Sequence, residues 1–177
     1  MLDLLIRELN MKAVLIISLL LQSTLVFAIN KSISIDVSLS PAGSFQIKSK
    51  RIKGRGLLEG TKFSASNIKI PIKSLKTGIE LRDGHLQKKL GIESNPKAVL
   101  LLVEAIGKNG AGSATFEVLG KKQTVPFTYK QESEKLGSAI FKLSLKKFGI
   151  TGISYMGAGV EDIVSVKVIC PFKIVKK

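Results

Sequence analysis

The sequence predicts an all-β protein of about eight mostly antiparallel strands with one short helix. Apolar and polar residues alternate along most of the chain after residue 30, as they do in strands that bury one face. Turns that contain Gly or Asn separate these runs at short intervals. Such a series forms a sandwich or a barrel, and a barrel of about eight strands can enclose one ligand. Periodicity alone does not distinguish the two architectures.

Three of the predicted strands precede the helix. Residues 33–39 alternate strictly between apolar and polar side chains. A second alternating run begins at residue 45 and ends in the glycine-rich stretch 54–60. A third covers residues 63–72, and Ser66-Asn67 is a candidate turn inside it. We therefore expect three strands between residues 33 and 72, before the helix.

A short helix is predicted for residues 81–90. The alternation of residues 68–72 ends at a Thr-Gly break, after which Leu86 and Leu90 recur one helical turn apart. This change from a period of 2 to a period of 3.6 indicates a strand followed by a helix. The only histidine of the chain, His85, lies in this segment beside an Arg and an Asp, so polar side chains gather at one end of a β-structure.

Five further strands are predicted after the helix. Residues 98–105 are almost continuously apolar, which fits a strand buried on both faces but also a short helix. The remaining runs alternate and are separated by turns. They cover residues 114–118, 125–129, 138–145 and 163–174.

Residues 11–28 have the features of a secretory signal peptide. Met11-Lys12 is a short positive start, residues 13–21 are apolar except for one Ser, and Val26-Phe27-Ala28 fits a cleavage site. The apolar run is shorter than the about 20 residues that a membrane-spanning helix needs. We therefore expect residues 1–28 to be removed, with Met11 as an alternative start, and a periplasmic or secreted location.

Residues 29–177 have the size of a single domain. The chain has 28 Lys and Arg against 13 Asp and Glu, a formal net charge of +15. Anionic lipid surfaces, acidic envelope polymers and nucleic acid are the partners that such a charge suits. Many lysines alternate with apolar residues, as on the solvated outer face of strands. Nucleic acid is not expected, because the export signal and the lack of a cluster of stacking aromatics disfavour it.

The sequence offers no catalytic constellation. A single histidine rules out a multi-histidine metal site, and Asp83 and His85 are two residues apart, so in a helix they point to different faces. The glycine-rich stretch 54–60 lacks the strand–loop–helix context of a phosphate-binding loop and fits a strand turn. Cys170, the only cysteine, lies in an alternating run and is predicted to be a buried small residue. We expect no enzyme activity, no metal and no cofactor.

Three segments together resemble a known family. They are Thr77-Gly78-Ile79 with Leu81-Arg82-Asp83 and His85-Leu86, then residues 120–127, then Phe148-Gly149-Ile150 with Ser154-Tyr155 and Val160-Glu161-Asp162. In this order they resemble the YceI-like family of bacterial lipid-binding proteins, over roughly residues 31–172. The resemblance implies an eight-stranded antiparallel, lipocalin-like barrel with a long apolar cavity. The implied ligand is a polyisoprenoid or a similar amphiphilic lipid.

Apolar residues on the predicted strand faces are the candidate ligand contacts. Ligand cavities are lined mostly by apolar residues, as cores are. These residues would therefore either line a lipid tunnel or fill a core. The candidates are Phe45, Ile47, Phe116, Val118, Phe127, Phe141, Leu143 and Phe148.

The polar candidates are Arg82, Asp83 and His85. In one interpretation Arg82 and His85 meet an anionic head group, because Arg offers paired donors to phosphate. In the other, these side chains hold the helix against the barrel.

These observations lead us to expect a periplasmic carrier that holds an isoprenoid or fatty-acyl lipid without turning it over. An anionic membrane surface is a further candidate partner, and the oligomeric state stays open. The alternative is a non-catalytic envelope module whose basic surface binds anionic polymers, a membrane surface or a protein partner.

Overall fold

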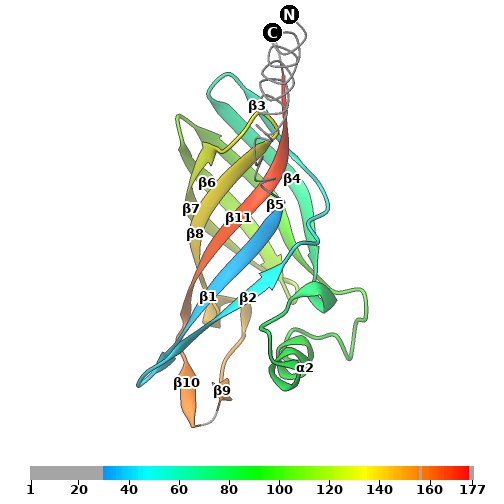
Figure 1. Cartoon of the computed structure of the whole chain (residues 1–177), viewed down its shortest axis with the longest axis vertical. Coiled ribbons are helices and arrows are strands. Elements are labelled where there is room, and N and C mark those ends of the chain that lie inside the picture. Colours follow the sequence, from blue (N-terminus) through cyan, green and yellow to red (C-terminus); the bar gives the residue numbers. More distant parts are fainter. Residues whose placement is uncertain (1–29, 156, 176–177) are drawn as a thin grey trace, which may run out of the picture.

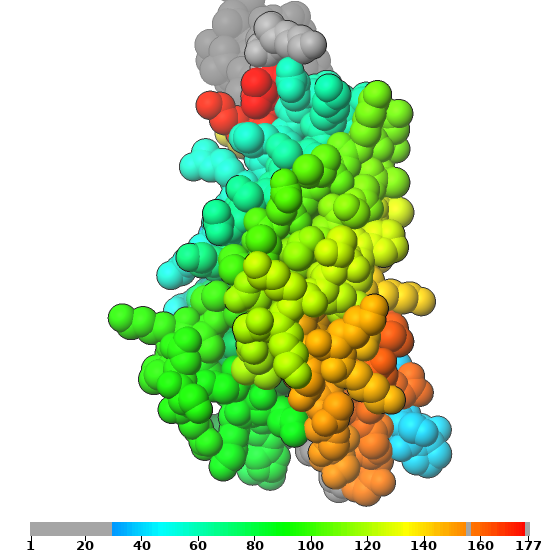
Figure 2. Space-filling view, turned by 180° about the vertical axis from the view of Figure 1, so that it is seen from behind, coloured from blue at the N-terminus to red at the C-terminus, as the bar shows by residue number. Residues whose placement is uncertain are grey.

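The computed structural model describes residues 30–155 and 157–175 as an elongated barrel of strands. The predicted signal peptide, residues 1–28, lies outside the described residues. In Figure 1 the helix α2 (Glu80–Lys89) lies beside one end of the barrel, and strand β3 (Gly56–Glu59) lies at the other. We call these the helix end and the far end. Figure 2, from behind, shows that the green segment with α2 and the orange segment with β9 and β10 both lie at the helix end.

The described residues contain eleven strands, one α-helix and two short 3-10 helices. The predicted helix over residues 81–90 is thus confirmed, shifted by one residue. The other elements are β1 (Ser32–Ser40), β2 (Ser44–Ser49), β4 (Lys62–Pro71), η1 (Ile72–Ser74), β5 (Val99–Lys108), β6 (Ala111–Val118), β7 (Lys121–Gln131), β8 (Leu136–Ser144), η2 (Lys146–Phe148), β9 (Ser154–Tyr155), β10 (Ala158–Val160) and β11 (Ile163–Ile174).

Seven strands close the barrel, in the order β3-β4-β5-β6-β7-β8-β11, and β11 pairs back onto β3. All of these pairings are antiparallel except β3–β11, which is parallel. The predicted all-β barrel with one short helix is therefore present and its pairings are mostly antiparallel, but seven strands close it instead of eight and one pairing is parallel. At the helix end β1 pairs with β11, and β2 and β10 pair with β1 as additional strands.

The parallel pair follows from the length of β11. Its residues Ser165–Ile169 pair with β1, which begins at Ser32, and its last residues pair with β3. Because β2 is antiparallel to β1, and β1 to β11, β2 runs in the direction of β11. After β2 the chain continues in the same direction and reaches the part of β11 that lies beyond the start of β1. Strand β3 pairs with β11 there, and because β3 runs in the direction of β2, it is parallel to β11.

Two ambiguous segments of the sequence are strands. The segment 98–105 is not a helix, because β5 begins at Val99 and continues through the rest of it. Ser66 and Asn67 are not a turn, because β4 runs unbroken from Lys62 to Pro71. Asn67 has a positive φ of 52°, but the register of β4 with β5 is the same on both sides of it, because Ser66 pairs with Glu104 and Ile68 with Leu102. Asn adopts this left-handed conformation more readily than most residues.

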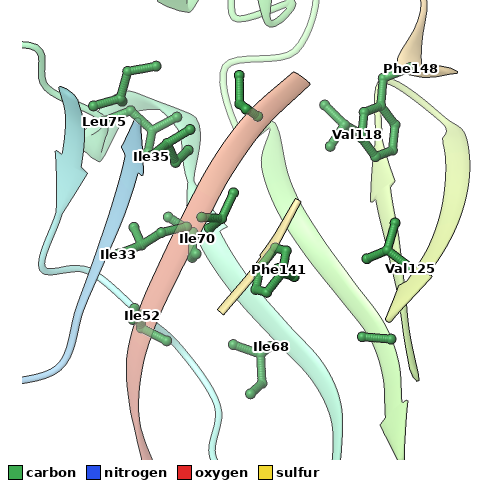
Figure 3. Close-up of a cluster of buried hydrophobic side chains, with 14 of the residues drawn as sticks. Ile33, Ile35, Ile52, Ile68, Ile70, Leu75, Val118, Val125, Phe141 and Phe148 are labelled. Atoms are coloured by element: carbon green, nitrogen blue, oxygen red, sulfur yellow. The ribbon is translucent and has the colours of Figure 1, made fainter. Parts of the chain in front are cut away.

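Apolar side chains from the inward faces of the strands form the core. Figure 3 draws part of this core, with side chains contributed by strands, by the segment after β2, by Leu75 directly after η1 and by Phe148 in η2. Val166, Ile52, Ile72, Leu75 and Phe148 are the largest side chains that are almost fully buried. Among the described residues, no helix is long and apolar enough to cross a bilayer.

Candidate functional site: an apolar cavity with a basic mouth

A cavity of about 390 Å³ lies inside the barrel. This volume falls within the range of about 300–1,000 Å³ that is usual for small-molecule sites. Its wall consists mainly of inward-facing apolar residues of the strands, and α2 contributes to one end. All eight apolar candidates border it, namely Phe45, Ile47, Phe116, Val118, Phe127, Phe141, Leu143 and Phe148. Their contact with a ligand stays a prediction.

Small side chains at inward positions leave this space unfilled. Ala105 on β5 and Ala114 on β6 are both buried, border the cavity and lie opposite each other in the strand pairing. Ala139 on β8 also borders it. Protein interiors are otherwise packed with few voids larger than a water molecule. Where two alanines meet across a strand pair, neighbouring side chains cannot reach far enough to fill the interior.

Aromatic rings form part of the cavity wall. Phe116 and Phe141 stack with ring centroids 4.4 Å apart and an interplanar angle of 23°. Phe141 lies opposite Phe127 in the pairing of β7 with β8. Such offset pairs add about 0.5–1.5 kcal/mol beyond the burial of their area. The wall is therefore stiff on this side of the barrel.

Helix α2 supplies basic side chains to the open end of the cavity, at the helix end of the barrel. Arg82, His85 and Lys89 border it, together with Leu86 and Leu90. Positions i, i+3, i+4 and i+7 of a helix share one face, so the spacing explains why these residues line up. His85 and Lys89 are exposed, and Arg82 is half-buried. Across from them the exposed residues Gly152 and Ser154 also border the cavity, so this is its mouth.

Arg82 lies over the ring of Phe45, with the guanidinium carbon 4.4 Å from the ring centroid. A cation in this position is attracted to the ring face by about 0.5–2 kcal/mol. The contact connects α2 with β2 and keeps the guanidinium group at the wall of the cavity. Arg82 is thus held at the mouth by a packed contact.

Asp83 points away from the cavity. Its side chain is 7% exposed and accepts hydrogen bonds from the backbone N–H of Thr77 (2.6 Å) and from the Thr77 hydroxyl (2.8 Å). The Lys76 ammonium lies 3.3 Å from the other carboxylate oxygen. Burial alone would raise the pKa of Asp83, but the Thr77 and Lys76 contacts outweigh it and the pKa lies below its usual value. These contacts fasten the first turn of α2 to the segment before it.

The three polar candidates therefore lie on different faces of α2. Arg82 and His85 border the cavity, whereas Asp83 contacts Thr77 and Lys76. Sequence reasoning missed Lys89, although its position seven residues after Arg82 places both on one helix face. That spacing was a usable signal.

A second network supports the other side of the mouth. Asp162 accepts hydrogen bonds from the Ser144 hydroxyl (2.9 and 3.0 Å) and from the backbone N–H of Lys146 (2.8 Å). The Lys146 N–H is the largest influence on the Asp162 carboxyl, and the pKa lies below its usual value despite partial burial. The network fixes η2, from which the chain continues to Gly152 and Ser154.

Cys170 is buried, as its place in an alternating run predicted, and it borders the cavity. Burial raises the pKa of the thiol to about 11. A thiol in this state stays protonated at neutral pH and is a poor nucleophile. Within residues 30–155 and 157–175, no group of three or more His, Cys, Asp or Glu side chains is placed to hold a metal ion.

Comparison with known proteins is consistent with this geometry. The family model of the YceI-like domain matches residues 21–172. A solved structure of a polyisoprenoid-binding domain from Saccharophagus degradans, implicated in plant cell wall breakdown, superposes with a TM-score of 0.54 at 12% identity. The match covers 78% of this chain and 91% of that one, and it shows a shared fold. No curated protein sequence gives a significant match. Since the family model spans most of its length, the chain belongs to the YceI-like domain family.

Proposed function

We propose that this protein is a carrier that holds the chain of an amphiphilic lipid, polyisoprenoid or fatty-acyl, inside the barrel and does not turn it over. The observation that carries the proposal is the 390 Å³ apolar cavity with a mouth bordered by Arg82, His85 and Lys89. The polyisoprenoid-binding description of the structural relative supports the same ligand class. A lipid has the matching shape, because it has a long apolar tail and one polar head.

Burial of the tail supplies the affinity. Each methylene group removed from water contributes about 0.8 kcal/mol. Ten buried carbons would therefore contribute about 8 kcal/mol, from which the cost of immobilising the lipid is subtracted. Binding in the micromolar range corresponds to about 8 kcal/mol net. A tail longer than ten carbons, or a contribution from the head group, is therefore needed to reach even micromolar affinity.

The basic residues at the mouth favour an anionic head group. The Arg82 guanidinium offers paired donors, and His85 and Lys89 lie on the same helix face at the mouth. We therefore extend the proposal to lipids with a phosphate or carboxylate head. Removing a hydrogen bond to a charged group costs about 1.5–3 kcal/mol, which is roughly 10- to 150-fold in affinity.

The lipid itself is tested by native mass spectrometry of gently purified protein, followed by lipid extraction. The wild type should carry a lipid with a chain. Leu143→Trp, which places a larger side chain in the cavity wall, should lose it. Lys142→Trp is the matched control, because this neighbouring residue of β8 is exposed and should retain the lipid. Lipid loss from both variants, or a wild type without lipid, would contradict the proposal.

The head-group preference is tested with an alkyl phosphate and an alcohol of equal chain length. Arg82→Ala should weaken binding of the phosphate by about 10-fold or more and leave binding of the alcohol nearly unchanged. Lys88→Ala is the control on the same helix, because Lys88 is exposed and pairs with Glu93 outside the cavity. An equal loss for both ligands would show that Arg82 acts through the structure of the mouth alone.

We also propose that the protein acts after export, in the periplasm or outside the cell. The support is the signal-peptide pattern of residues 11–28. N-terminal sequencing of the mature protein should begin at Ile29. An intact start at Met1 or Met11 in the soluble fraction would contradict this.

The second candidate function is an envelope module that binds anionic polymers, a membrane surface or a protein partner through its basic exterior. The net charge of +15 favours it, and lysines such as Lys142 and Lys167 lie at exposed positions of the barrel strands. A protein that carries no lipid but is retained on an anionic matrix at physiological salt would support this function instead.

A further inference from the structure

The far end of the cavity is divided from a second, smaller cavity by an aromatic ring. The smaller cavity has a volume of about 40 Å³ and is bordered by Leu58, Tyr129 and Phe172, among others. Phe127 borders only the larger cavity and Tyr129 only the smaller one, whereas Phe63, Ala139 and Cys170 border both. Of these three side chains only Phe63 carries a ring, which makes it the bulky part of the partition between the two spaces.

The strand pairing explains why aromatic rings meet at this point. Phe63 on β4 lies opposite Gly107 on β5, which lies opposite Gly112 on β6, which lies opposite Phe127 on β7. Two glycines in one row leave the inner surface of the barrel bare between the two phenylalanines. Their rings meet there edge to face, with centroids 6.0 Å apart.

Tyr129 fixes the arrangement from the far end. Its ring lies 5.1 Å from that of Phe63 and 5.6 Å from that of Phe127, so the three rings contact one another. Its hydroxyl donates a hydrogen bond of 2.7 Å to the carbonyl of Thr61 in the β3–β4 turn. A Cβ on Gly107 would lie 2.6 Å from the Tyr129 ring, so the glycine is needed for the ring to sit there.

We propose that the Phe63 ring, held by Phe127 and Tyr129, sets the length of lipid chain that the protein accepts. The inference rests on the proposed function, in which the head stays at the mouth and the tail enters the barrel. A tail that starts at the helix end and points to the far end meets the Phe63 ring at the end of the larger cavity. Chain length is then measured between two fixed points, the basic face of α2 and the aromatic partition.

The physical consequence is a break in the dependence of affinity on chain length. Each added methylene that finds room in the cavity tightens binding about fourfold. A carbon that would pass the partition must displace a packed ring or leave the chain partly in water. Affinity therefore stops rising at a limiting chain length, and the position of Phe63 determines that length.

Two substitutions should move the limit in opposite directions. Phe63→Ala removes the ring of the partition and should join the two cavities, adding the volume of the ring to the space open to the chain. Ala139→Leu adds side-chain volume at a position that borders both cavities and should shorten the limit. Leu57→Ala is the matched control, because Leu57 is an exposed residue of β3 at the same end of the barrel, borders neither cavity and should leave the limit in place.

The experiment is isothermal titration calorimetry of the full mature protein with saturated fatty acids of increasing length, each below its critical micelle concentration. The wild type should gain about fourfold per carbon up to the limit and then stop gaining. Phe63→Ala should continue to gain for at least about two more carbons, roughly 16-fold in affinity for those chains. Ala139→Leu should stop gaining earlier than the wild type, which keeps the test decisive if Phe63→Ala does not fold.

The outcomes separate the two proposals. If the wild type binds the fatty acids and the limit does not move in Ala139→Leu or in a folded Phe63→Ala, the partition does not measure the chain and the carrier function stands. A limit that moves equally in Leu57→Ala would contradict the role of Phe63 as well. If the wild type binds no member of the series, the proposed function itself is wrong, and the length measurement with it.

Discussion

The contacts of Asp83 allow the cost of losing it to be worked out. In Asp83→Ala the Thr77 N–H and hydroxyl lose their acceptor, and hydrogen bonds to a charged group are worth about 1.5–3 kcal/mol each. The ion pair adds little, because the Lys76 side chain is 60% exposed and exposed pairs contribute about 0–1 kcal/mol. Removal of the carboxylate also relieves its desolvation, so we expect a net loss of about 3 kcal/mol.

A loss of this size is readily measured by thermal unfolding. For a domain of about 150 residues, 1 kcal/mol shifts Tm by about 2–4 °C, so Asp83→Ala should lower Tm by about 6–12 °C. Glu134→Ala is the control, because this carboxylate is exposed in the β7–β8 loop and its removal should change stability by less than about 0.5 kcal/mol. A Tm of Asp83→Ala within 2 °C of the wild type would refute the anchoring role.

The pH dependence of a second variant, Asp83→Asn, gives a further check. The pKa of Asp83 in the folded protein lies below its usual value, so the folded state favours the ionised form. The stabilisation is therefore complete above about pH 4, the usual pKa of an unfolded Asp, and is lost as the pH falls through the folded-state pKa. The Tm difference between wild type and Asp83→Asn should be largest at neutral pH and should shrink below about pH 4. A constant difference would mean that the charge is not involved.

Three further predictions concern single residues. Cys170 should react with a thiol reagent at pH 8 at least about 100-fold more slowly in the native protein than in denaturant, because its pKa is raised to about 11 and its side chain is buried. Equal rates would mean that the thiol is accessible. Gly84→Ala should stabilise the protein by about 0.5–1 kcal/mol in urea unfolding, because Gly84 lies inside α2 and an added Cβ meets open space. Gly107→Ala should destabilise it by about 1–3 kcal/mol in the same assay, because the Cβ would press on the Tyr129 ring. Equal effects of the two glycine substitutions would contradict the packing argument.

The sequence predicted what depends on local pattern. Alternation identified the strands before and after the helix, and the change of period at the Thr-Gly break identified α2 to within one residue. Closure of the barrel was not predictable in the same way. It depends on the pairing of Gly56 with Phe172, residues far apart in the chain, and on where β1 begins beside β11. The local sequence pattern of β3 or β11 does not indicate which strand pairs with it.

The cavity illustrates the same distinction at the level of side chains. The inward positions could be read from each strand alone, and the eight apolar candidates do border the space. Whether that space is filled depends on which small residues face each other, as Ala105 and Ala114 do, and on glycines such as Gly107 opposite Phe63. Strand register fixes these pairs, and a register is set by the whole sheet.

Arg82 and Asp83 show why a short motif should not be interpreted as one site. Adjacent residues in a helix are 100° apart around its axis, so they cannot face the same space. Asp83 faces Thr77 and fastens the helix, while Arg82 faces the cavity and lies over Phe45. Helix anchoring therefore applies to Asp83, and also to Arg82 through its contact with Phe45, whereas head-group contact by Arg82 stays a prediction. The buried carboxylate fixes the orientation of α2, and that orientation aims Arg82, His85 and Lys89 at the mouth of the cavity.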